Sequence, residues 1–348
     1  MKLQRQWPCV HACRTLRRLS WQTNPWSVSS VGERQMSRFF SSKRAFPATY
    51  RSLDVLPDTS IDGFREKWFR PELPVLLPPG HFRSLPAAST WFSPRKSSVS
   101  PVLNYNYWTK YADTVVPLEV TRYNHRNIGD KPHGGNESFH RFHAPLRLFL
   151  DWTQLGQEQT CRLYLAQCQL NDLPSGLRDD LPTPEIVLTA GKGDIYDTNI
   201  WIGMPPTYTP LHRDPNPNLF VQLAGSKKVR LLPPEAGMRV FARVRMDLGQ
   251  SAGPEAAAFR GEEMMEGREK ALLEDIIWSH EESSPPVVSD ITGFEAFLEA
   301  GDAVFIPKGW WHSIKGVGEG ITASVCSRCS QREHVVRLTY SQVNWWFR

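Results

Sequence analysis

Two strand-like segments that lie far apart in the chain carry side chains suited to one metal ion. His212 and Asp214 are two residues apart in TYTPLHRDPNPN, and His312 follows GDAVFIPKGWW. In an extended segment, residues i and i+2 point to the same face, so His212 and Asp214 can reach a common ion. A third ligand must then come from a neighbouring strand. This requirement predicts a sheet in which the two segments lie side by side.

The three side chains also indicate a type of chemistry. Imidazole and carboxylate ligands suit Fe(II), Mn or Zn, and a set that leaves positions open favours iron chemistry with oxygen. The HxD triplet alone is weak evidence, and His312 could equally be a core histidine between Trp311 and Ser313. Because both parts lie among strand-like segments, we interpret the pattern as that of a non-haem iron oxygenase.

Short segments rich in β-branched and aromatic residues, bounded by Gly and Pro, predict strands over much of the chain. They are CRLYLAQCQL, EIVLTA, DIYDTNIWIGM, NLFVQLAG, KKVRLLPP, FEAFLEA, DAVFIP, WHSIKG and ITASVCS. The tight turn at Gly225 and Ser226 predicts a hairpin, and IDGFREKWF and RFHAPLRLFLDW show helical spacing. Many short strands with turn signals are typical of a mainly β sandwich or barrel with flanking helices.

The chain divides into three regions by composition. Residues 1–50 carry nine Lys or Arg and one acid, a net charge of +8, and are rich in Ser; this is typical of a mitochondrial presequence, although a disordered basic tail has the same composition. We expect residues 51–140 to form an extension that packs on the barrel. The main domain then covers 141–348, with a helical insertion at about 238–285.

Several classes of protein are not favoured. The rest of the chain has 32 basic and 35 acidic residues, a net charge of −3, which gives little support for a nucleic-acid partner. No apolar run reaches the length of a transmembrane helix. The six cysteines, without a secretory signal, do not indicate a disulfide framework, and the Cys326–Cys329 pair lacks a second CxxC to complete a zinc site.

Alternation along a strand places Lys227 and Lys228 on opposite faces, so only one of them can point into a barrel. A buried lysine stays charged only beside an anion or a similar partner. Lys227 is therefore a candidate counter-charge for an anionic co-substrate. The alternative is that Lys228 is the inward residue.

The string TPLHRDPNPNLFVQLAGSKK, followed by GDAVFIPKGWWHSI, closely resembles the JmjC domain of the cupin superfamily. The nearest branch is similar to the small hydroxylases related to the asparaginyl hydroxylase that inhibits hypoxia-inducible factor. The resemblance covers about residues 140–330. It implies a double-stranded β-helix, also called a jelly-roll or cupin barrel, and a dioxygenase that uses Fe(II) and 2-oxoglutarate.

The resemblance also implies roles for single residues. The metal ligands would be His212, Asp214 and His312, which are also the catalytic set. Residues that would bind 2-oxoglutarate or lie beside it are Tyr164, Thr209, Asn218, Lys227 and Cys326. Cys326 stands where these hydroxylases often carry Asn, and a thiol is a weaker hydrogen-bonding group than an amide.

We therefore expect a 2-oxoglutarate-dependent oxygenase that takes O2 and hydroxylates a protein side chain. Alternatives are an oxygenase of a small molecule or RNA, a histone lysine demethylase, and an inactive cupin-like binding protein. The polar segment at 121–145 could line the mouth of the site, or be a surface loop. The C-terminal VNWWFR could cover a barrel edge or meet a second subunit in a homodimer.

Overall fold

The computed structural model describes residues 48–95, 98–123, 137–155, 161–191, 194–257, 261–278 and 291–329. The predicted presequence, apart from its last three residues, and the C-terminal VNWWFR lie outside this part of the chain. Those last three residues belong to a strand, β1 (Ala48–Ser52). Within the described residues, no helix is both long enough and apolar enough to cross a bilayer.

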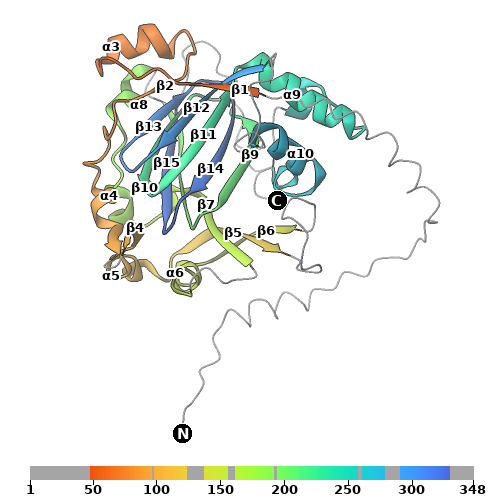
Figure 1. Ribbon diagram of the computed structural model, residues 1–348. Coiled ribbons are helices and arrows are strands. Elements are labelled where there is room, and N and C mark those ends of the chain that lie inside the picture. Colours follow the sequence, from red (N-terminus) through yellow and green to blue (C-terminus); the bar gives the residue numbers. More distant parts are fainter. Residues whose placement is uncertain are drawn as a thin grey trace, which may run out of the picture. The chain divides into compact units, whose positions relative to one another are not determined.

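Two sheets form the centre of the fold (Figure 1). The five-stranded sheet has the order β1, β12 (Ile291–Leu298), β11 (Ser226–Leu232), β14 (Trp311–Val317) and β9 (Thr207–Arg213). The eight-stranded sheet has the order β2 (Val75–Leu76), β13 (Ala303–Ile306), β10 (Asn218–Ala224), β15 (Thr322–Cys329), β8 (Ile195–Gly203), β7 (Cys161–Gln169), β5 (Val115–Tyr123) and β6 (Glu137–Pro145). Apart from β1, which runs parallel to β12, the paired strands of both sheets are antiparallel.

The inner faces of the two sheets enclose one apolar core. It consists of Leu53, Phe220, Val229, Leu231, Ala296, Leu298, Val304, Ile306, Trp310, Ile314 and Cys326. These residues come from strands of both sheets, as alternate positions of a two-sheet sandwich must. The arrangement is that of a cupin or jelly-roll barrel, which confirms the predicted fold class.

Each sheet is also covered on its outer face. On the five-stranded sheet, α9 (Pro234–Asp247) and α10 (Gly267–Trp278) pack their apolar sides over Leu211, Leu232 and Trp311. The outer face of the eight-stranded sheet is covered by α3 (Ile61–Phe64), α4 (Pro86–Thr90), α5 (Tyr105–Trp108), α6 (Leu146–Gln154), α7 (Ser175–Asp179) and α8 (Glu185–Ala190). Figure 1 shows the two groups of helices on different sides of the barrel.

Shorter elements complete the covering layer. A hairpin, β3 (Phe92–Arg95) and β4 (Ser98–Leu103), lies between α4 and α5 in the chain. The π-helical turn η3 (Arg65–Phe69) continues α3, so the helix predicted at IDGFREKWF is confirmed. The remaining turns are 3₁₀ segments: η4 (Thr109–Tyr111), η5 (Leu170–Asp172), η6 (Pro254–Ala257) and η7 (Glu262–Met264).

The predicted hairpin at Gly225 and Ser226 is wrong. The strand before the turn, β10, pairs with β13 and β15, whereas the strand after it, β11, pairs with β12 and β14 in the other sheet. Gly225 has φ +62°, and a Cβ there would run into the Ile321 carbonyl oxygen. The tight turn therefore carries the chain from one sheet to the other.

EIVLTA, predicted as a strand, is the helix α8. Pro184 precedes its first residue and Gly191 follows its last, which are favourable flanking residues for a short helix. Ile186, Val187 and Ala190 are buried, but Leu188 is 44% exposed. This burial follows a helical rather than an alternating pattern, so packing on the eight-stranded sheet outweighs the β-branched composition.

Two helix predictions are partly right. In RFHAPLRLFLDW, the first residues belong to β6, and α6 begins only after Pro145, where Leu146, Phe149 and Leu150 supply its buried face. The helical insertion predicted at about 238–285 does separate two paired strands, β11 and β12, and it contains the helix α10. Its other helix, α9, begins at Pro234, slightly before the predicted start of the insertion.

Candidate metal centre

The strands β9 and β14 bring the candidate ligands together. They pair antiparallel, and His212 lies directly opposite His312 in the register. Asp214 follows the last residue of β9, and the three side chains offer ligand atoms that all lie within 4.8 Å of one another. Donor atoms about 2.1 Å from a common ion lie within about 4 Å of each other, so only a small closure separates this cluster from a coordination sphere.

Hydrogen bonds to the main chain orient both imidazole rings. Nδ1 of His212 lies 2.9 Å from the Pro210 carbonyl oxygen, and Nδ1 of His312 lies 3.2 Å from that of Trp310. A carbonyl oxygen only accepts, so each Nδ1 must carry the proton and donate. The lone pair then resides on Nε2, the atom that each ring offers to a metal.

The charge state of the cluster also suits a cation. Burial, with a contribution from His212, lowers the pKa of His312 to about 3, so its ring is neutral at pH 7. For Asp214, burial acts to raise the pKa, but Arg328 and the two histidines lower it to about 2. Two imidazoles, that of His312 neutral, and one ionised carboxylate are a donor set that fits a divalent transition-metal ion.

An irregularity in β9 concerns Thr209, which precedes His212 by three positions. From Thr209 to His212, β9 advances three residues while β14 advances only two, from Ile314 to His312. This extra residue is a β-bulge, which re-aims the following side chains. Thr207 lies inward, against Tyr164 and Gly316, and alternation places Thr209 on the same face. The bulge thus brings Thr209 and His212 to one side of the strand.

Lys227 lies deep inside the barrel and is only 2% exposed, whereas Lys228 is half-buried on the opposite face. The Lys227 Nζ donates hydrogen bonds to the Ser324 Oγ at 2.7 Å and to the Tyr164 hydroxyl at 3.3 Å. Burial lowers its pKa to about 8. No carboxylate among the described residues forms an ion pair with it, so this pocket presents a buried cation and two hydroxyl groups.

Asn218 and Cys326 lie between the two ends of the site. Both are buried, and the Asn218 side chain is within hydrogen-bonding reach of the Cys326 sulfur. Burial raises the pKa of this thiol to about 12, while Arg328 and Lys227 both act in the other direction. The thiol is therefore protonated at neutral pH and lies close to charges from both the ligand cluster and the lysine pocket.

Arg328 is a residue of the site that the sequence analysis missed. It projects from β15 and donates to both Asp214 and Asp197, the latter from β8. In the sequence it is only one of many arginines, two positions after Cys326. Its partners come from segments more than a hundred residues away, so only the strand register brings the three together.

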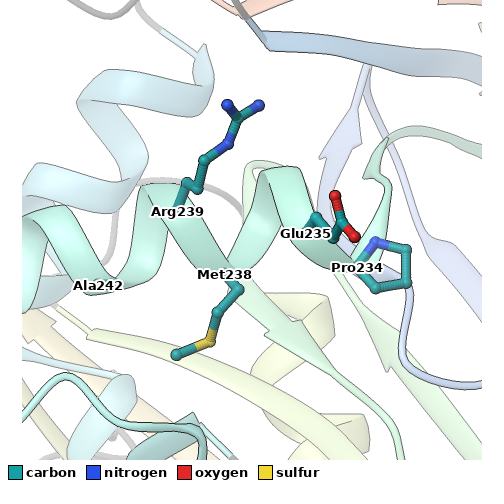
Figure 2. Close-up of a pocket in the computed structure, with 5 residues that line it drawn as sticks. All are labelled: Pro234, Glu235, Met238, Arg239 and Ala242. Carbon is teal, nitrogen blue, oxygen red and sulfur yellow. The ribbon is translucent and has the colours of Figure 1, made fainter.

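A second hollow lies outside the barrel, on α9. Pro234, Glu235, Met238, Arg239 and Ala242 line it, and all five belong to that helix (Figure 2). It is open to solvent and includes none of the candidate ligands. We assign no chemistry to it.

The fold and the site together define the chain as a cupin-type barrel with a candidate metal centre between β9 and β14. Comparison with known proteins agrees, because the cupin-like domain family matches residues 69–348. The chain belongs to this family.

Several relatives have names that refer to the JmjC domain or to demethylation. The chain is 28% identical over 161 residues to "Lysine-specific demethylase JMJ30" of Arabidopsis thaliana, covering 46% of this chain and 32% of that protein. It is 23% identical over 274 residues to "Jumonji C domain-containing protein 5" of Drosophila melanogaster, covering 76% and 57%. A shorter match, 39% over 88 residues, is to "Lysine-specific demethylase 8" of Danio rerio, covering 25% and 22%. The chain thus spans only a third to just over half of the first two relatives.

Proposed function

We propose that this protein is an Fe(II)- and 2-oxoglutarate-dependent oxygenase. The observation that carries the proposal is the joint placement of two features inside one barrel. At one end, two imidazoles and the Asp214 carboxylate converge. At the other, Lys227 is a buried cation without a carboxylate partner among the described residues. A dianion that ligates the metal with one end and meets a lysine with the other fits this pair.

In this proposal His212, Asp214 and His312 would hold the iron. When bound, iron and 2-oxoglutarate together would supply the oxidative chemistry, in which O2 is consumed and 2-oxoglutarate becomes succinate and CO2 while a substrate C–H is hydroxylated. The protein's own task is to bind and orient the participants and to exclude water from them.

The lysine pocket would bind the distal carboxylate of 2-oxoglutarate. The Lys227 ammonium would provide the charge, and the hydroxyl groups of Ser324 and Tyr164, which already contact it, would donate hydrogen bonds. Burial raises the pKa of Tyr164 well above its usual value, so this hydroxyl keeps its proton and can donate. Thr209 and Asn218 are proposed to contact the same molecule nearer the metal, with Cys326 beside it.

We propose a protein side chain as the substrate and hydroxylation as the outcome, in line with the motif resemblance to asparaginyl hydroxylases. Lysine demethylation is a second candidate, because the relatives include proteins named as lysine-specific demethylases. The two reactions share the same step on a C–H bond. They differ in that hydroxylation of an N-methyl carbon releases formaldehyde.

Mass spectrometry can separate these reactions. Protein loaded with Fe(II), 2-oxoglutarate and O2 would be incubated with a peptide library that contains both unmodified and methylated lysines. A peptide that gains one oxygen atom supports hydroxylation, and loss of a methyl group with formaldehyde supports demethylation. Failure to bind metal or to form succinate under any condition would favour an inactive binding protein and contradict the proposal.

A further inference from the structure

Arg328 contacts the candidate metal ligand Asp214 with two of its nitrogen atoms. Its Nη2 lies 3.1 Å from Asp214 Oδ1, and its Nε lies 3.4 Å from Oδ2. The third nitrogen, Nη1, donates to Asp197 Oδ2 at 2.9 Å. One guanidinium group therefore joins two carboxylates, and only the first of them belongs to the ligand cluster.

The strand register fixes this arrangement. Arg328 lies directly opposite Asp197 on β8 and opposite Asn218 on β10, so β15 holds it between two neighbouring strands. The Arg328 side chain is 24% exposed and that of Asp214 is 10% exposed. A guanidinium group is a rigid planar fork, and bidentate contacts with carboxylates fix orientation as well as charge. Asp197 therefore holds one edge of the guanidinium group, while the other edge faces Asp214.

The two oxygen atoms of Asp214 consequently have different surroundings. Oδ1 makes the shorter contact with Arg328. Oδ2 makes the longer one and lies 3.8 Å from Nε2 of His312, the nitrogen offered to a metal. The carboxylate is thus turned so that Oδ1 faces the guanidinium, whereas Oδ2 lies between the guanidinium and His312.

We propose that Arg328 is a positioning residue, which holds Asp214 so that Oδ2 alone is presented to the metal. The inference rests on the proposed function. A carboxylate that is free to rotate can bind a metal through both oxygens and occupies one more position on it. By holding Oδ1, Arg328 keeps that position open, and the co-substrate and O2 need open positions. Asp197 supports this role indirectly, by holding Arg328.

The number of water molecules on bound Mn²⁺ tests the role, since it reports open positions directly. Water-proton relaxation would be measured for Mn²⁺ bound to the wild type, Arg328→Gln and Asp197→Asn. We expect Arg328→Gln to lose one of about three coordinated waters, which lowers the relaxivity by about one third. Asp197→Asn should change it in the same direction but less, and it keeps the test valid if Arg328→Gln does not fold.

Arg245→Gln is the matched control, because it breaks another largely buried arginine–carboxylate pair, with Glu269, on α9 and α10 outside the barrel. It should leave the relaxivity of bound Mn²⁺ unchanged. If both Arg328→Gln and Asp197→Asn have the relaxivity of the wild type, the proposed role of Arg328 is wrong, but the proposed function is not affected. A wild-type protein that binds no Mn²⁺ would instead contradict the proposed function, and this role with it.

Discussion

At the scale of single residues, Lys227 has an unusual environment for a lysine. It is buried, its hydrogen-bond partners are hydroxyl groups, and its pKa is lowered to about 8. Replacement by Met should weaken 2-oxoglutarate binding about 10- to 100-fold, because a hydrogen bond to a charged group contributes roughly 1.5–3 kcal/mol. Calorimetric titration of the Mn²⁺-loaded protein measures this, and Mn²⁺ affinity should not change.

The neighbouring lysine supplies the control for that experiment. Lys228 lies on the opposite face of β11 and is half-buried, so Lys228→Met should bind 2-oxoglutarate as the wild type does. Equal losses in the two variants would show that Lys227 is not the counter-charge.

The lowered pKa of Lys227 also predicts how co-substrate binding depends on pH. Below about 8 the free protein carries an ammonium here, and above it a neutral amine. Affinity for 2-oxoglutarate should therefore be constant between pH 6 and 7 and fall as the pH rises through about 8, by up to about tenfold per unit. A titration series at fixed ionic strength would show it. In Lys227→Met this decline should disappear, and its persistence there would assign it to another group.

At the scale of elements, the contact of α9 with β14 supports the site from outside the barrel. Trp311, next to His312, is fully buried against α9, where Gly237 packs on its ring. A methyl group at Gly237 would overlap Trp311, so Gly237→Ala should destabilise the protein by about 1–3 kcal/mol, despite the better helix propensity of Ala. Denaturant unfolding measures this.

A glycine in the same insertion provides the comparison. No atom lies within 4 Å of a Cβ built at Gly253, so Gly253→Ala should change the free energy of unfolding by less than about 0.5 kcal/mol. If Gly237→Ala is as stable as Gly253→Ala, α9 does not clamp Trp311.

Local sequence patterns predict where strands and helices lie better than they predict which strands pair with one another. Composition and flanking Gly or Pro located β7, β8, β10, β11 and β14, because each of these patterns depends on one segment alone. The error at Gly225 has a different cause, since a tight turn does not reveal whether the next strand joins the same sheet or the opposite one. Likewise, alternation shows that Lys227 and Lys228 lie on opposite faces of β11, but which of them points into the barrel is known only once the inner face of the strand is known.

At the scale of the whole molecule, the candidate site depends on contacts between distant segments. The candidate ligands and Lys227 could be proposed from the sequence, because spacing, alternation and the family resemblance depend only on their order along the chain. Arg328 could not, because its role arises only when β8 and β15 pair and bring Asp197 opposite it.

The predicted role of the basic segment at residues 1–50 as a mitochondrial presequence also concerns the whole molecule. We propose that it directs the protein into mitochondria and is removed there. Sequencing the N-terminus of the protein isolated from cells should then find a start within or just after this segment, in the mitochondrial fraction. Protein that begins at Met1 in the cytosol would contradict the proposal.

The central claim is that His212, Asp214 and His312 hold an iron that acts on 2-oxoglutarate. Its most direct test is the formation of succinate from 2-oxoglutarate by purified protein with Fe(II) and O2, in the absence of a substrate. We expect slow succinate formation by the wild type and by Lys228→Met. We expect none by His212→Ala, which should lose metal binding but retain the fold. Succinate formation by His212→Ala at the wild-type rate would contradict the claim.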